Sequence, residues 1–195
     1  MPETKRYAYR WELVAPVDEV SAVLAELVDF ARWWPSSWLE TTEVATGASS
    51  GLGRVVSVRS RGRSPEVFEW AARCVASEAT AWTWQLFGDL EGTLRVEVRA
   101  EGERTVADVV WEVVVERAEL RGSLFGATVF AADLAWMMAR GEEALRIELG
   151  RRVSDEGHTP PSGPRSDSTL PRTLVTVGIV AAVAGLVGLL LRRRP

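Results

Sequence analysis

Two neighbouring stretches of apolar–polar alternation constrain the fold of this chain more than any other feature. Leu94, Val96 and Val98 alternate with charged residues, and after a short turn at 101–103 the alternation resumes across 105–115. A period of two is typical of a β-strand with one buried face. Consecutive strands joined by a short turn pair in the antiparallel direction. The chain therefore contains an antiparallel sheet with one apolar face.

A change of period past Gly122 predicts one long helix after these strands. Phe130, Leu134 and Met137 fall on one helical face, in a helix from about 128 to 149. Such a helix extends about 33 Å. Before the two alternating runs we predict a strand at 7–13, helical segments at 17–28 and 29–34, strands within 39–116, and a five-residue turn at 88–92 with glycine at both ends.

This order of elements predicts an α+β fold of the helix-grip class. One strand and two short helices precede about six antiparallel strands, and the long helix comes last. In this fold a curved antiparallel sheet, here of about six to seven strands, wraps around the final helix.

Four short motifs strengthen this assignment by resemblance to a known family. VAPVDEV at 14–20, DFARWWP at 29–35, FGDLEGT at 87–93 and MARG at 138–141 together resemble the SRPBCC (START-like) superfamily, in particular its polyketide cyclase/dehydrase-like members. The resemblance covers residues 7–149. It implies an elongated apolar cavity between the sheet and the long helix, which in most members binds a hydrophobic small molecule or lipid.

The nine tryptophans of the chain supply aromatic lining for such a cavity. An aromatic and methionine-containing interior suits flat or greasy ligands. The alternative is that these rings simply fill the core, because the inward face of a sheet is apolar in either case. The predicted ligand-binding residues are Trp11, Trp82, Trp84, Trp111, Trp136 and Met137.

The residues that usually carry catalysis or bind metal are scarce. The single histidine, His158, lies outside the predicted domain, and the single cysteine, Cys74, alternates within a strand as a buried small residue does. The glycine-rich loop at 47–53 lacks the Lys-Ser/Thr ending of a phosphate-binding loop. We therefore predict no catalytic residue, no metal and no cofactor.

Carboxylates and arginines leave a few alternatives open. Asp133 is either an acid or base at the cavity mouth or a solvated helix residue paired with an arginine. Asp89 and Glu91 fix the geometry of their turn, and Asp108 lies on the outer face of its strand. A basic group formed by Arg54, Arg59, Arg61 and Arg63 is either a solvated hairpin or a contact for anionic lipid headgroups.

The end of the chain differs in composition from the predicted domain at 1–150. Residues 1–150 carry a net charge of −8, whereas 151–195 carry +4. We predict a flexible linker at 151–172, which is rich in Pro, Gly and Ser, a transmembrane helix at 173–191, which has no charge, and a short basic tail at 192–195.

Two alternatives describe how this tail would attach the domain: a membrane anchor or a sorting signal. No secretory signal precedes the domain, so we predict a single-pass C-terminal anchor with a cytoplasmic domain. Leu170-Pro171-Arg172-Thr173 instead resembles a cell-wall sorting signal, and the terminal arginines oppose the positive-inside tendency. Small residues within 173–191 permit a weak homodimer through this helix. An acidic chain with one lysine is a poor match to nucleic acid.

We predict a membrane-tethered START-like domain that binds a hydrophobic small molecule or lipid and is not an enzyme. The alternatives are a polyketide cyclase/dehydrase-like enzyme and a ligand-free module that binds a protein partner. An empty apolar cavity of at least about 300 Å³ favours the first function. A buried carboxylate or tyrosine in the cavity favours the second, and a packed core favours the third.

Overall fold

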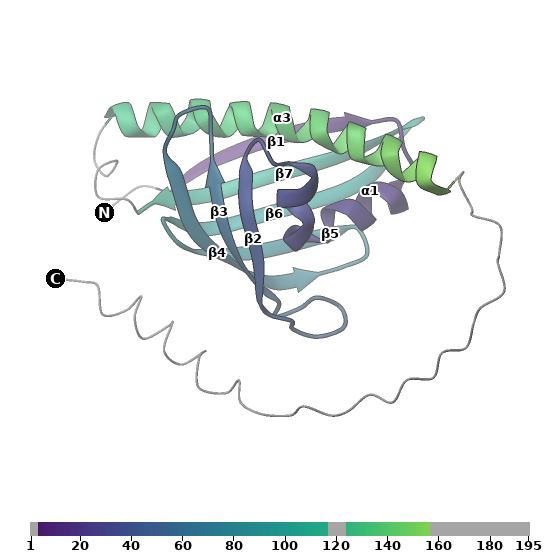
Figure 1. The fold of residues 1–195 in the computed structure, drawn as a ribbon, viewed down its shortest axis with the longest axis horizontal. Coiled ribbons are helices and arrows are strands. Elements are labelled where there is room, and N and C mark those ends of the chain that lie inside the picture. Colours follow the sequence, from purple (N-terminus) through teal and green to yellow (C-terminus); the bar gives the residue numbers. More distant parts are fainter. Residues whose placement is uncertain (1–3, 117–123, 157–195) are drawn as a thin grey trace, which may run out of the picture. The chain divides into compact units, whose positions relative to one another are not determined.

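One sheet of seven antiparallel strands forms the framework, in the order β1-β7-β6-β5-β4-β3-β2 (Figure 1). The computed structural model describes residues 4–116 and 124–156, which belong to one compact unit. The first and last strands pair with each other. The strands are β1 (Lys5–Leu13), β2 (Trp38–Ala45), β3 (Val55–Arg61), β4 (Val67–Ser77), β5 (Ala81–Gly88), β6 (Leu90–Glu101) and β7 (Arg104–Val115).

The helical segments confirm the predicted order of elements. Figure 1 shows the last and longest helix, α3, lying along the sheet next to β1. Because a seven-stranded antiparallel sheet holds this helix against one face, the fold matches the helix-grip class. The segments are α1 (Val17–Leu24), η1 (Leu27–Asp29), α2 (Phe30–Trp33) and α3 (Leu124–Glu156).

Irregular strand pairing bends the sheet around α3. The pairing of β2 with β3 shifts register between Trp38 and Glu40 and again before Ala45. The pairing of β4 with β5 shifts between Cys74 and Ala76. Each such bulge leaves one residue unpaired and increases the local twist. The sheet therefore curves and encloses its apolar face.

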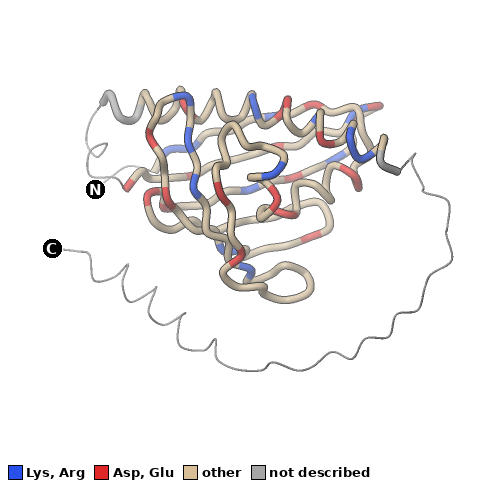
Figure 2. Tube along the Cα trace, in the orientation of Figure 1, with Lys and Arg blue, Asp and Glu red and all other residues tan. Residues whose placement is uncertain are grey.

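The two faces of the sheet differ in polarity, as the alternation predicts. Trp84, Val96 and Trp111 are buried on the inner face, whereas Arg95 and Glu112 lie on the outer face. Figure 2 shows basic and acidic residues interspersed along the strands. The charge of the domain is therefore distributed in neighbouring pairs of opposite sign and forms no block of one sign on the sheet.

A continuous row of five tryptophan rings crosses the core. Trp11 contacts Trp34, Trp34 contacts Trp38, Trp38 contacts Trp70 and Trp70 contacts Trp111, with centroids 5.3 to 5.9 Å apart. Most of these pairs meet edge to face, the geometry that aromatic quadrupoles prefer. The row connects β1, the end of α2, β2, β4 and β7, so it ties sequence-distant elements together.

Trp34 also fixes the approach of α3 to this row. Its side chain is fully buried, and its indole ring lies against the backbone of α3 at Gly141. A Cβ atom at Gly141 would overlap that ring. Glycine is therefore required here for close helix packing.

The predicted five-residue turn at 88–92 is wrong in its length. β5 ends at Gly88 and β6 begins at Leu90, so Asp89 alone lies between them. Both strands continue because Gly88 still pairs with β4 and Leu90 already pairs with β7. The Asp89 carboxylate accepts a hydrogen bond of 2.9 Å from the backbone N–H of Glu69. Asp89 therefore fixes the turn through the neighbouring strand.

The long helix exceeds its predicted range of 128–149 at both ends. It continues through residues 151–156, so this part of the predicted linker at 151–172 is helical. The physical reason is local, because Arg151 and Arg152 bond to Glu148 three and four residues before them. Ion pairs at this spacing stabilise a helix.

Glu148 also joins α3 to α2. Its side chain is buried, and both of its oxygens accept hydrogen bonds from the guanidinium of Arg32, at 3.0 and 3.1 Å. Hydrogen bonds from Arg151, together with those from Arg32 and Arg152, hold the pKa of the Glu148 carboxyl well below its usual range. This ion cluster therefore holds the C-terminal part of α3 against α2.

Within residues 4–116 and 124–156, no helix is long and apolar enough to cross a membrane. The predicted transmembrane helix at 173–191 and the basic tail at 192–195 lie outside the described residues. The same holds for the predicted linker beyond Glu156 and for His158.

We expect Gly141→Ala to lower the free energy of unfolding by about 1–3 kcal/mol, because the added methyl group overpacks the Trp34 ring. Gly150→Ala on the same helix is the matched control, since a Cβ there meets nothing within 4 Å. Helix propensity alone makes that control more stable by about 0.5–1 kcal/mol. Urea unfolding followed by circular dichroism measures both. Equal effects of the two variants would contradict the proposed packing.

We expect Glu148→Gln to reduce stability at neutral pH by about 2 kcal/mol, through loss of charge-assisted hydrogen bonds. The folded pKa of Glu148 is depressed, so its contribution is present above the unfolded value of about 4.3 and is lost as pH falls below it. The stability difference between the wild type and Glu148→Gln should therefore shrink between about pH 5 and pH 3. A stability difference that stays constant over this interval would contradict the proposed contribution of the ionised Glu148.

Candidate ligand-binding site

A small cavity lies between α3 and the inner face of the sheet. Its volume is about 10 Å³, which is room for about one water molecule. The walls are apolar and aromatic over most of their extent. The lining residues are Phe68, Leu90 and Trp111 from the sheet, Phe130, Leu134 and Met137 from α3, and Ser60, Gly62 and Asp133 at the polar end.

Asp133 forms the polar end by bonding to the connection between β3 and β4. One carboxylate oxygen accepts hydrogen bonds from the backbone N–H groups of Arg63, at 3.1 Å, and Ser64, at 3.0 Å. The other oxygen accepts from the hydroxyl of Ser64. The side chain packs against Gly62, where a Cβ would overlap it. The prediction that Asp133 is a solvated residue paired with an arginine is wrong, because the hairpin backbone buries it.

Two further polar groups border the cavity. The Ser60 hydroxyl oxygen accepts a hydrogen bond of 2.8 Å from the indole N–H of Trp70. The indole N–H of Trp111 is buried and has no acceptor among the described residues. Nearly all buried donors in proteins have a partner. Three buried tryptophans outside the cavity lining also have an indole N–H without an acceptor among the described residues, so this property is not specific to the cavity: Trp33, Trp34 and Trp38.

The six predicted ligand-binding residues separate into two groups. Trp111 and Met137 line the cavity. Trp11, Trp82 and Trp84 are buried on the inner face but lie outside the lining, and Trp136 is half-buried under the guanidinium of Arg140. These four belong to the packed core or to its edge. Contact of any of the six with a ligand stays a prediction.

Sequence reasoning missed most of the lining. The Ser60 position follows Val56 and Val58 at a period of two in β3, so the alternation already places it on the inner face. Phe68 has the same signal in β4. No local pattern marks Gly62, because its role depends on Asp133 from a distant helix.

One tyrosine of β1, Tyr7, lies beside the cavity wall. The ring of Tyr7 meets Phe130 edge to face, with centroids 5.8 Å apart. Burial raises the pKa of the Tyr7 and Tyr9 phenols, so both stay protonated at neutral pH. Neither residue lines the cavity.

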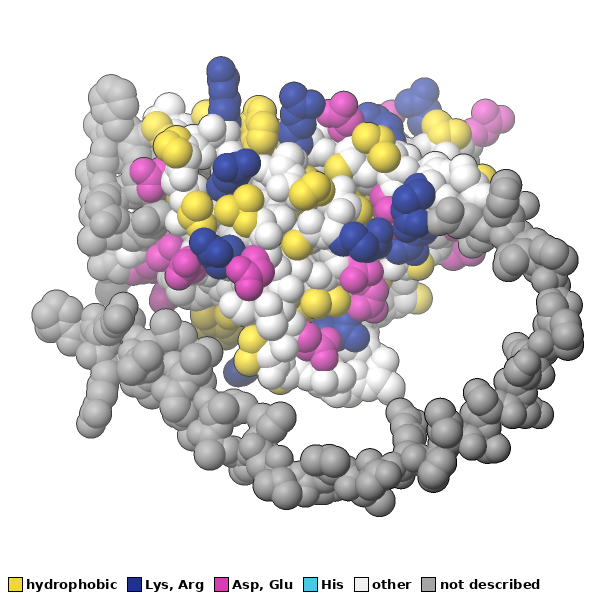
Figure 3. Space-filling view, viewed as in Figure 1, with side chains coloured by type: hydrophobic (Ala, Val, Ile, Leu, Met, Phe, Trp, Pro, Cys, Tyr) yellow, Lys and Arg dark blue, Asp and Glu magenta, His cyan; other side chains and the backbone are white. Residues whose placement is uncertain are grey.

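Structural interactions are observed for Cys74, for Asp108 and for two of the four arginines of the basic group, whereas contact of this group with anionic lipid stays a prediction. Cys74 is buried, and burial raises the pKa of its thiol, which disfavours the nucleophilic thiolate. Asp108 lies on the outer face as predicted and pairs with Arg99. In the basic group, Arg54 pairs with Glu26 and Glu43, and Arg59 pairs with Glu40 and Glu69. Figure 3 shows basic side chains next to acidic ones on this face.

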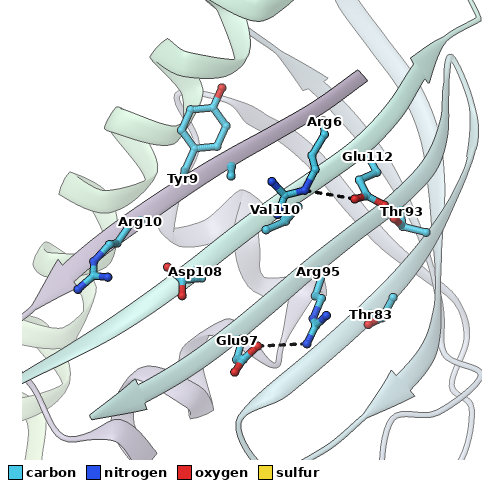
Figure 4. Close-up of a pocket in the computed structure, with 11 residues that line it drawn as sticks. Arg6, Tyr9, Arg10, Thr83, Thr93, Arg95, Glu97, Asp108, Val110 and Glu112 are labelled. Carbon is cyan, nitrogen blue, oxygen red and sulfur yellow. Dashed lines mark hydrogen bonds and ion pairs between the residues drawn. The ribbon is translucent and has the colours of Figure 1, made fainter. Parts of the chain in front are cut away.

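A second hollow of about 630 Å³ lies on the outer face, across β1, β5, β6 and β7 (Figure 4). It is a polar groove in which Arg6 pairs with Glu112 and Arg95 pairs with Glu97, at 3.3 and 3.2 Å. Its charged side chains are partly exposed and already paired. The groove is therefore the solvated face of the sheet, and its chemistry does not suit an apolar ligand.

The groups under α3 that could take part in chemistry are few. Among the described residues, no group of three or more His, Cys, Asp or Glu side chains is placed to hold a metal ion. Asp133 already accepts three hydrogen bonds, a pattern that suits an acceptor-only carboxylate. The cavity has an aromatic and apolar wall, but its volume is far below the roughly 300 Å³ of a small-molecule site.

Comparison with known proteins shows similarity to solved structures but not to known sequences. The chain matches no family model, and no curated protein matches it in sequence. Solved structures do resemble it. The Zhui aromatase/cyclase from Streptomyces sp. R1128 has a TM-score of 0.66 at 18% identity, over 80% of this chain and 99% of that one.

Two further structures extend the comparison. A START superfamily protein from Mycobacterium smegmatis has a TM-score of 0.60 at 12% identity, over 75% of this chain and 98% of that one. Norcoclaurine synthase from Thalictrum flavum has a TM-score of 0.57 at 16% identity, over 78% of this chain and 98% of that one. The described part of the chain therefore has the same fold as these START-superfamily and aromatase/cyclase structures.

Proposed function

We propose that the domain binds an apolar small molecule between α3 and the inner face of the sheet. The observation that carries this proposal is the apolar, aromatic cavity between α3 and the sheet; one of its lining residues is Trp111, whose indole N–H has no acceptor among the described residues. A ligand oxygen that accepts from it would remove a desolvation cost of about 1–3 kcal/mol. The resemblance of the fold to START-superfamily and aromatase/cyclase structures supports the same location.

Binding at this location requires the cavity to expand. A volume of about 10 Å³ is far below the roughly 300 Å³ of a ligand site. Met137 gives the wall some adaptability, because its unbranched side chain has three rotatable bonds and repacks at low cost. Hydrogen bonds from the β3–β4 hairpin to Asp133 hold the polar end closed. A ligand can replace these hydrogen bonds with its own. The protein thus binds by opening between α3 and the β3–β4 hairpin.

An aromatase/cyclase-like enzyme is the second candidate. A buried carboxylate, Asp133, lines the cavity, and the similar Zhui structure is an aromatase/cyclase. Against this role, the carboxylate already accepts three hydrogen bonds, and no histidine lies in the described residues. The closed core also fits a module that binds a protein partner, which is the remaining outcome if no small molecule binds.

We further propose that the segment 173–191 holds this domain at a membrane. The basis is the sequence alone: the run lacks charge and is long enough to cross the hydrocarbon region. Tethering would keep the site near the phase that dissolves apolar ligands, and so raise their effective concentration.

The binding proposal predicts a one-to-one complex between the full chain and prodan, a neutral naphthalene with a carbonyl acceptor. Native mass spectrometry of the chain released from detergent measures the complex directly. We expect Met137→Phe, which adds volume inside the cavity, to weaken binding about tenfold, which is about 1.4 kcal/mol.

Ala139→Phe is the matched control, because the same residue is introduced on the exposed face of the same helix. It should bind prodan as the wild type does. Thermal unfolding confirms that both variants fold. No adduct with the wild type, or equal affinity in both variants, would contradict a site under α3.

The tether proposal predicts that removal of residues 173–195 releases the protein from membranes. The full chain should stay in the membrane pellet after washing at alkaline pH, whereas the shortened chain should be in the supernatant. A charged variant, Ala182→Arg, is the point-mutation control and should weaken retention. Recovery of the full chain in the supernatant would contradict the tether proposal.

A further inference from the structure

The outer face of α3 has no charge over residues 128–139. The single charged residue of this stretch, Asp133, is buried, whereas Val129 is 41% exposed. Trp136 is half-buried and lies seven residues after Val129, so both are on the same side of the helix. An exposed helix face normally carries charged and polar residues. We propose that this face lies on the surface of a bilayer that contains anionic lipids. The exposed side chains that form the uncharged face are Thr128, Val129, Ala132, Ala135 and Ala139.

The second half of the same helix has the usual surface of a solvated helix. Arg140 pairs with Glu143 at 2.7 Å, and Arg146 pairs with Glu142 at 2.6 Å. Charged residues therefore begin directly after Ala139, where the uncharged face ends. The lack of charge is a property of the cavity end of α3 and not of the whole helix.

The β3–β4 hairpin adds two arginines at the edge of this face. Its backbone bonds to Asp133, which lies between Val129 and Trp136 on the helix, and Figure 1 shows the hairpin reaching α3. Arg61 and Arg63 are exposed. In Figure 3, hydrophobic and basic side chains lie next to each other where the hairpin meets α3.

These two guanidinium groups differ from the other arginines of the basic group. Within 4–116 and 124–156, neither Arg61 nor Arg63 forms an ion pair, whereas Arg59, on the same strand as Arg61, pairs with Glu40 and Glu69. The segment 61–66 also contains Glu66, so its net charge is +1. A guanidinium group without a carboxylate partner is suited to a lipid phosphate, which it can bind through two hydrogen bonds.

The size of the uncharged face favours a lipid surface over a protein partner. Twelve helical residues extend about 18 Å, and a helix is about 10 Å wide. A stable protein interface buries about 1,200–2,000 Å² in total, which is far more than this face provides. On a membrane, weak docking is sufficient because a tether raises the effective concentration. The inference therefore rests on the proposed tether at 173–191.

The charge of the domain limits which side can approach an anionic surface. Residues 1–150 carry a net charge of −8, and an anionic membrane attracts basic segments and repels acidic ones. The uncharged face has no acidic side chain and has Arg61 and Arg63 beside it. It is therefore the side on which contact with anionic headgroups meets no repulsion from the helix itself.

This orientation would place the cavity end of the domain at the lipid. Phe130, Asp133 and Met137 line the cavity from the inner side of the same helical turns that carry Val129 and Trp136. The turns that cover the cavity are thus the ones that contact the bilayer. The inference deepens the proposed function by stating which part of the domain faces the membrane.

A nitroxide label at Ala135→Cys tests the contact in the full chain, reconstituted in vesicles of phosphatidylcholine and phosphatidylglycerol. Electron paramagnetic resonance measures how strongly oxygen, which concentrates in lipid, and a nickel chelate, which stays in water, relax the label. We expect a higher oxygen-to-nickel ratio at Ala135→Cys than at Ala79→Cys, the matched label in the exposed turn between β4 and β5. Cys74 is buried, and wild-type protein taken through the same labelling gives its background.

Two double variants test the role of the arginines with the same label. Arg61→Gln with Arg63→Gln should lower the oxygen-to-nickel ratio at Ala135→Cys to the value measured at Ala79→Cys, because both unpaired cations are lost. Arg59→Gln with Arg95→Gln removes the same charge from arginines that are already paired, so it should keep the ratio. Vesicles of phosphatidylcholine alone should give the lower ratio for every form of the protein.

The outcomes distinguish this inference from the tether proposal. If the full chain does not stay with the vesicles, the tether proposal fails and this inference fails with it. If the chain stays but the two labels give equal ratios, the tether stands and the inference is overturned. A label at Ala135→Cys that is shielded from both oxygen and nickel would indicate contact with protein and would overturn the assignment to lipid. Equal ratios in the two double variants would overturn the role of Arg61 and Arg63.

Discussion

The close approach of Trp34 to the backbone of α3 determines where the rest of the domain can pack. At Gly141 the ring and the helix leave no space for a side chain, so the helix cannot slide or rotate there without a clash. Trp34 also belongs to the tryptophan row that reaches from β1 to β7. One contact therefore sets the distance between the long helix and every strand that this row touches.

The two halves of α3 are held by different physical interactions. The C-terminal half is anchored by rigid packing at Gly141 and by the buried Glu148 with its arginines. The half before Gly141 covers the cavity through Phe130 and Met137, and Asp133 bonds it to the hairpin. Interlocked rings resist displacement, whereas hydrogen bonds can be exchanged for equivalent ones. Deformation of the domain is therefore concentrated at its cavity end.

Much of the fold could be predicted because its signals are local. A period of two identified the strands and their inner faces, and the change to helical spacing placed α3. The errors came from long-range interactions. The turn at 88–92 is short because its flanking residues pair with β4 and β7, and α3 runs past 149 because Glu148 collects three arginines, one of them from α2.

The candidate site was harder to predict for the same reason. Trp111 and Met137 were found because apolar periodicity placed them on the inward faces of the sheet and the helix. The two alternatives for Asp133 could not be decided, because its partners, the backbone N–H groups of Arg63 and Ser64, lie about 70 residues away in sequence. Periodicity identifies which face a residue occupies, but it does not show which polar atoms meet there.

Under the proposed function, the position of Asp133 couples ligand recognition to opening of the site. The same carboxylate oxygens that border the cavity hold the hairpin through Ser64. A ligand hydroxyl that reaches Asp133 can replace the Ser64 hydroxyl, so one hydrogen bond is exchanged for another and the net cost of loosening the hairpin is small. An apolar molecule without a donor breaks the bond without restoring it. Admission of a ligand to the cavity would then depend on whether the ligand replaces this one hydrogen bond.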